Sequence, residues 1–201
     1  ALFPNFRDGD VKGSSPDPVA ITGQKYFIDN ISFNGAAMPK IVTADLLTFE
    51  DDDASGALVV GNASDVKWPG SFEGASTAIA TPGVARTGKA LEFTKNGNPW
   101  SGINLYKVAD GENLTSAEAP VISFDYFSPD ATNSPVMLKL ESSGPSLRAV
   151  LTAVPGWNRF DVDFSTLSGA NGTWSADVTY KQIALFPNFR DGDVKGSSPD
   201  P

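Results

Sequence analysis

Strand alternation brings aromatic and charged side chains onto shared faces in two parts of the chain. Asp125 and Phe127 share one face of an expected strand, and Lys139 and Glu141 share one face of another. An aromatic ring can cover the flat C–H face of a sugar while nearby polar groups bond its hydroxyls. These residue types therefore suit glycan recognition, and they equally suit an internal ion-pair patch with packed aromatic rings.

A run of acidic residues, EDDD at 50–53, follows another expected strand. Calcium takes about six to eight oxygen ligands, drawn from carboxylates and backbone carbonyls. The run therefore suggests a calcium site, and a solvated acidic turn explains the same residues.

The composition excludes the commoner catalytic centres. The chain has no cysteine and no histidine, which removes disulfides, Cys–His zinc sites and histidine-based triads or dyads. Asp125 and Glu141 are a conceivable carboxylate pair for glycoside hydrolysis. Since the chain holds 24 acidic residues, such pairs arise readily by chance, and we expect no enzymatic activity.

The charge and hydropathy of the chain limit its partners. Its 15 basic and 24 acidic residues give a net charge of −9, which repels the phosphate backbone of nucleic acids. No apolar run of about 18 residues is present, so we expect no membrane insertion. The chain shows no signal peptide and does not begin with Met, which is typical of a mature or excerpted piece of a larger protein.

The pattern of elements is all-β. Short runs rich in Val, Ile, Leu, Phe and Tyr alternate with clusters of Gly, Pro, Asn, Asp and Ser. The expected strands are 25–33, 46–50, 90–95, 102–107, 120–127, 135–141, 147–153, 159–164 and 180–186. We predict an antiparallel two-sheet β-sandwich or jelly roll with little helix.

The two ends of the chain carry the same sequence. Residues 1–18 and 184–201 both read ALFPNFRDGDVKGSSPDP, an offset of 184 − 1 = 183 residues. That offset is about the length of one domain. The chain is therefore either slightly more than one period of a tandem array or one domain with the same segment at both ends.

Five motifs arrive in an order that resembles a known family. They are LLTFEDDDASG (46–56), TGKALEFTKNGNPWSGINL (87–105), ISFDYFSPDATNSPVMLKLES (122–142), PGWNRFDVDFS (155–165) and YKQIALFPNF (180–189). This order resembles the jelly-roll, carbohydrate-binding-module-like repeats of secreted bacterial glycoside hydrolases and surface proteins. The resemblance implies a β-sandwich, calcium binding, and glycan recognition rather than catalysis.

The resemblance also implies site residues. A structural calcium that ties the first strand to the last would use Glu50, Asp52 and Asp29. Trp157, which follows a Pro-Gly pair, reads as structural. A concave glycan-binding face would be built from Trp100, Asp125, Phe127, Lys139, Glu141 and Arg148.

The family pattern is rotated in this chain. The family closes with a strand like YYIDDI, and the matching segment here, QKYFIDNISF (24–33), stands at the front. Residues 1–37 therefore resemble the closing strands of a preceding repeat, or permuted closing strands. Residues 38–201 resemble a β-sandwich repeat that lacks its last strand. From this frame we expect residues 1–33 to pack mainly outside the 45–201 domain.

The expected function is that of a non-catalytic, carbohydrate-binding-like repeat of an extracellular tandem-repeat protein. Its partners would be a polysaccharide or glycan and neighbouring copies of the repeat, in glycan binding or adhesion at the cell surface. The alternative is a purely structural building block of a surface filament, assembled head to tail by strand complementation.

Overall fold

The fold is an all-β sandwich, seen in a computed structural model that describes residues 23–34, 49, 61–62, 69–84, 86, 88–96, 98, 100–107 and 121–189. Two short 3₁₀ turns, Phe164–Thr166 and Gly169–Asn171, are the only helical pieces in these ranges. The strands are β1 Lys25–Asn34, β2 Gly61–Asn62, β3 Gly70–Phe72, β4 Ser76–Ala80, β5 Ala90–Thr94, β6 Gly102–Lys107, β7 Val121–Ser128, β8 Ser134–Ser142, β9 Leu147–Ala153, β10 Gly156–Asp163 and β11 Tyr180–Pro187.

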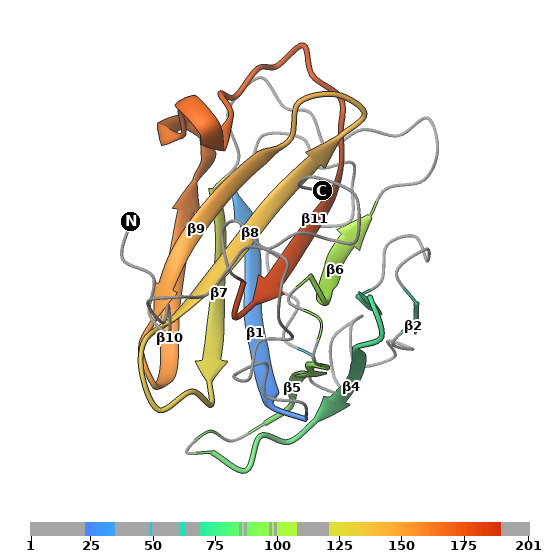
Figure 1. The fold of residues 1–201 in the computed structure, drawn as a ribbon, viewed down its shortest axis with the longest axis vertical. Helices are drawn as coiled ribbons and strands as arrows, with labels where there is room; N and C mark the ends of the chain where they lie inside the picture. Colours follow the sequence, from blue (N-terminus) through green and yellow to red (C-terminus); the bar gives the residue numbers. More distant parts are fainter. Residues whose placement is uncertain are drawn as a thin grey trace, which may run out of the picture.

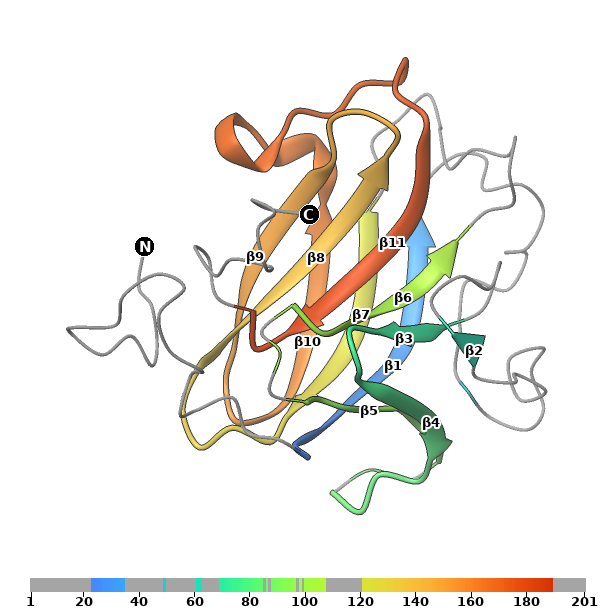
Figure 2. The ribbon, with the colours of Figure 1, turned by 45° about the vertical axis from the view of Figure 1, so that its right-hand side comes forward.

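The strands form two sheets. One has the order β10-β7-β1-β5-β4 and the other the order β2-β3-β6-β11-β8-β9. All pairs are antiparallel except the short β2–β3 pair. Figures 1 and 2 show the sheets face to face, with β8 and β11 crossing over β7 and β1. The predicted antiparallel β-sandwich is confirmed.

Alternation of apolar residues builds the core between the sheets. On β7, Phe124 and Tyr126 are fully buried, and on β8 Leu138 and Leu140 are fully buried. The residues between them point to the outer faces, as period-two alternation requires. The main core therefore takes every second residue of each central strand and leaves the intervening residues to the two outer faces.

The N-terminal strand occupies the centre of its own chain's sheet. β1 pairs with β5 on one side and with β7 on the other. Tyr26 and Ile28 are fully buried in the main core. The expectation that residues 25–33 pack outside this chain's domain is therefore wrong, because the sandwich needs β1 to cover its core. β1 therefore belongs to the sandwich of its own chain, and residues 1–22 lie outside the described part of the chain.

A second, smaller apolar cluster lies on the outer face of the six-stranded sheet. It consists of Trp100, Met137, Ala184, Phe186 and Phe189, all nearly or fully buried. The strand β6 begins under this cluster with Gly102, where an added Cβ would lie 2.6 Å from the Leu185 carbonyl oxygen. Only glycine permits this close approach of β6 to β11.

Candidate functional site

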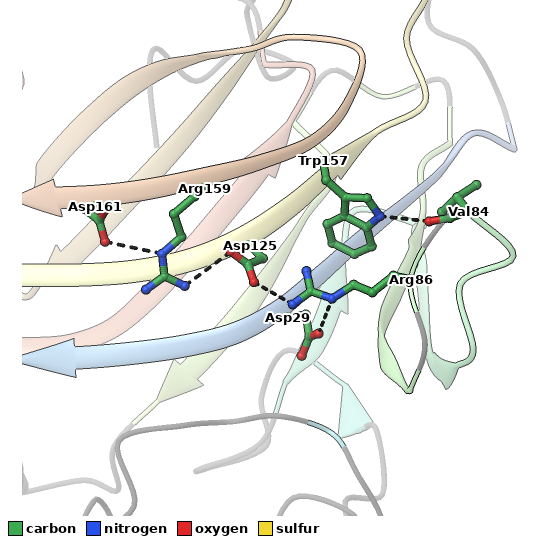
Figure 3. A network of polar contacts seen from close by, with 7 residues as sticks. All are labelled: Asp29, Val84, Arg86, Asp125, Trp157, Arg159 and Asp161. Atoms are coloured by element: carbon green, nitrogen blue, oxygen red, sulfur yellow. Dashed lines mark hydrogen bonds and ion pairs between the residues drawn. The ribbon is translucent and has the colours of Figure 1, made fainter.

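Three charged residues lie side by side on the outer face of the five-stranded sheet. Asp29 of β1 is opposite Asp125 of β7, and Asp125 is opposite Arg159 of β10. Two carboxylates directly across a strand pair repel each other, so the sheet needs a cation between Asp29 and Asp125. We call Asp29, Arg86, Asp125, Arg159 and Asp161 the charged ladder (Figure 3).

Arg86 supplies that cation from the connection between β4 and β5. Its Nε lies 3.2 Å from Asp29 Oδ2, and its Nη2 donates to Asp125 Oδ2 at 2.7 Å. The Asp29 side chain is 6% exposed and that of Arg86 is 26% exposed. Because both carboxylates are largely removed from water, their pairing with one guanidinium is a condition of the folded sheet.

The ladder becomes more exposed toward β10. Arg159 Nη1 lies 3.3 Å from Asp125 Oδ1, and its Nε lies 3.5 Å from Asp161 Oδ1. The side chains of Arg159 and Asp161 are 46% and 62% exposed. Because both side chains reach solvent, the hydroxyls of a ligand can approach them from outside the sheet.

Aromatic rings form a parallel row beside the charges. Phe27 lies opposite Phe127 with ring centroids 6.0 Å apart, and Phe127 lies opposite Trp157 with centroids 5.6 Å apart. The Arg86 guanidinium carbon is 4.5 Å from the centroid of the Trp157 ring, a cation–π contact. The Trp157 indole N–H donates to the Val84 carbonyl at 2.9 Å. Trp157 thus contacts both Val84 and Arg86, and these contacts hold the connection between β4 and β5 against the sheet.

The residues predicted for the concave face are divided between the two sheets. Asp125 and Phe127 lie on the outer face of the five-stranded sheet, beside Trp157. Lys139 and Glu141 are on β8 and Arg148 is on β9, in the six-stranded sheet. Since outer faces of a sandwich point in opposite directions, these residues do not share one face.

The six-stranded sheet buries much of what was expected to face a ligand. Trp100 is 3% exposed and packs against Phe186 and Phe189. The Lys139 side chain is 4% exposed and pairs with Glu141 at 3.3 Å. Glu141 also accepts a hydrogen bond from Gln182. This side of the molecule therefore matches the alternative of an ion pair with packed aromatic rings.

Of the three candidate calcium ligands, only Asp29 belongs to the described residues. Glu50 and Asp52 lie outside the described residues. Asp29 is described, and its carboxylate contacts the Arg86 guanidinium. A guanidinium at that distance opposes a second cation, so Asp29 does not fit as a calcium ligand in this arrangement. Within the described ranges, no three His, Cys, Asp or Glu residues gather closely enough to hold a metal ion.

Sequence reasoning missed three members of the ladder. Arg159 and Asp161 alternate with Phe160 and Val162, so the strand pattern already placed them together on the outer face. Arg86 stands in a connection between strands, where no periodicity marks its direction. Only the fold brings it to Asp29 and Asp125.

A separate group of polar side chains lies inside the sandwich near the end of β11. Burial, with the nearby Asp130 carboxylate, raises the pKa of Tyr26 far above its ordinary value, although a hydrogen bond from Asn188 acts in the opposite direction. Burial also raises the pKa of Tyr126 strongly, as do Tyr26 and Asp130. The Tyr126 hydroxyl has no hydrogen-bond partner among the described residues. Both phenols are therefore held in the neutral form.

None of the known protein families, the curated proteins or the solved structures matches this chain. No helix within the described ranges is long and apolar enough to cross a membrane.

Proposed function

We propose that this protein is a non-catalytic, extracellular glycan-binding module, and that it binds its ligand on the outer face of the five-stranded sheet. The observation that carries the proposal is the exposed end of the charged ladder, where Arg159 follows the partly exposed Trp157 on the outer face of β10 and contacts Asp161. Planar hydrogen-bonding groups next to an aromatic ring are what sugar hydroxyls and C–H faces require.

The rigidity of this face supports the proposal. Arg159 is held by Asp125, and Trp157 is held by its hydrogen bond to Val84 and by the Arg86 guanidinium. Groups fixed in advance lose little conformational entropy when a ligand binds. The net charge of −9 disfavours anionic polymers, so the proposed ligand is a neutral polysaccharide.

Retention on insoluble neutral polysaccharides tests the proposal. We expect the protein to be pulled down by at least one of cellulose, chitin and insoluble xylan. Arg159→Ala and Asp161→Ala should each weaken that binding about tenfold, the effect of losing hydrogen bonds worth about 1.4 kcal/mol. Neither change removes a buried group, so both variants should keep the parent's circular dichroism spectrum.

Arg148→Ala is the matched control, since Arg148 is the same residue type on the six-stranded sheet. It should bind like the parent. Binding lost in Arg148→Ala but kept in Arg159→Ala and Asp161→Ala would place the ligand on the opposite face. No retention on any polysaccharide would leave the structural building block as the better account of the chain.

We also propose a structural calcium at the acidic run, with Glu50 and Asp52 as ligands. Calcium that binds only the folded state should raise the melting temperature. At a free calcium concentration one hundred times the dissociation constant, the free energy of unfolding should rise by about 2.7 kcal/mol. Glu50→Ala should abolish the rise, whereas Asp161→Ala should keep it. Identical melting curves in calcium and in chelator would remove calcium from the account.

A further inference from the structure

The second copy of the repeated segment begins with residues that fill one well-defined place in the fold. Residues 184–189 (ALFPNF) continue β11 between β6 and β8. Every residue of this segment is buried. We call this place, defined by residues 184–189, the β11 slot.

Residues 184–189 are held in the β11 slot by apolar packing on both faces of the six-stranded sheet. Leu185 is fully buried in the main core, opposite Leu138 of β8 and Ile103 of β6. Phe186 and Phe189 enter the second cluster with Trp100, on the other face of the same sheet. Because apolar side chains are taken up on both faces of the strand, few unrelated sequences would fit. Residues 1–6 have the same sequence, ALFPNF, and so carry every side chain the slot requires.

The topology brings the first copy within reach of the slot. β1 begins at Lys25, which is opposite Thr94 at the end of β5. Leu185 of β11 is opposite Ile103 near the start of β6. Residues 95–101 join the end of β5 to the start of β6, so the end of β11 and the start of β1 lie at the same end of the sandwich.

The chain between residue 6 and β1 is long enough for residues 1–6 to reach the β11 slot. Residue 6 precedes β1 by 25 − 6 = 19 residues, which can span about 60 Å when extended. The two sheets of a sandwich are only about 10 Å apart. The first copy can therefore lie in the slot while the chain continues directly into β1.

We propose that residues 1–6 are a second occupant of the β11 slot. They replace residues 184–189 of the same chain when a substitution prevents residues 184–189 from packing there. The resident copy has an advantage, since β11 also includes Tyr180 and Ile183, which are buried and paired to β8. The first copy is therefore the reserve occupant.

Aspartate substitutions in the two copies test this inference. Leu2→Asp should leave the melting temperature unchanged, because the resident copy holds the slot. Leu185→Asp should lower the melting temperature but keep a cooperative transition, because residues 1–6 take over. The double variant, Leu2→Asp with Leu185→Asp, should lose the cooperative transition, since neither copy can bury an aspartate.

Leu138→Asp is the matched control, because Leu138 is as buried as Leu185 and lies opposite it in a segment that is not repeated. It should abolish cooperative unfolding whatever residue stands at position 2. If Leu185→Asp is as severe as Leu138→Asp, residues 1–6 do not enter the slot and the inference is overturned.

A crosslink identifies the occupant directly, since the chain has no cysteine of its own. In the Leu185→Asp protein, Leu2→Cys and Ile103→Cys should form a disulfide under mild oxidation, just as Leu185 faces Ile103 in the parent. The product should run as a monomer on a non-reducing gel. A disulfide-linked dimer, or no disulfide, would overturn the assignment to the same chain.

Discussion

Replacing Arg86 with alanine is expected to lower the free energy of unfolding by about 3 kcal/mol, the usual cost of removing one partner from a buried charge pair. The change leaves the Asp29 carboxylate, which is 6% exposed, facing Asp125 with no guanidinium between them. It also removes the cation that stacks on Trp157. Denaturant unfolding monitored by tryptophan fluorescence measures the loss.

Two further variants separate this effect from a simple loss of surface charge. Arg159→Ala also removes a partner of Asp125, but its side chain is 46% exposed, so the loss should stay below about 1 kcal/mol. Adding Asp29→Asn to Arg86→Ala should recover part of the stability, because one buried charge disappears. Equal losses for Arg86→Ala and Arg159→Ala, with no recovery by Asp29→Asn, would show that Arg86 does not neutralise a buried pair.

Raising the pH above 10 is expected to destabilise the protein steeply. In the unfolded chain a tyrosine loses its proton near pH 10, whereas burial raises the pKa of both Tyr26 and Tyr126 in the folded state. The unfolded state therefore binds fewer protons above pH 10, and stability is lost as the pH rises. Each phenol contributes about 1.4 kcal/mol per pH unit, so the two together contribute about 2.8 kcal/mol per pH unit.

Tyr126→Phe provides the control for this pH dependence. The Tyr126 hydroxyl has no hydrogen-bond partner among the described residues, so its removal should cost little at pH 7. The variant should lose stability less steeply than the parent above pH 10, because one of the buried phenols is gone. Phenolate absorbance in the folded protein gives an independent reading. If all four tyrosines ionise near pH 10 before the protein unfolds, Tyr26 and Tyr126 are not held neutral by burial.

The strands that alternate strongly could be predicted from the sequence. The segments around Phe124 and Leu138 alternate between large apolar and polar residues, and the structure buries the apolar set as expected. By contrast, β3 and β4 were not predicted. They are short and rich in Gly, Ser and Ala, which have little preference for strands, and they are strands because β3 pairs with β6 and β4 pairs with β5.

Long-range placement limited the prediction of the site. Alternation puts Asp125 and Lys139 on outer faces, but it does not say that the faces belong to different sheets. The position of β1 follows from pairing with β5 and β7, which no local pattern encodes. The Pro-Gly pair before Trp157 predicts a structural role, and the hydrogen bond of its indole to Val84 is consistent with that role. Trp157 also belongs to β10, and it lies on the outer face that we propose for binding.

The indole N–H signals of the tryptophans test the proposed binding face most directly. The chain has four tryptophans, so a ¹H–¹⁵N spectrum contains four indole signals, which Trp157→Phe and Trp100→Phe variants would assign. Titration with soluble oligosaccharides of the retained polysaccharide should shift the Trp157 signal and leave the Trp100 signal in place, because Trp100 is buried on the opposite sheet. A shift of Trp100 without a shift of Trp157 would contradict the proposed face.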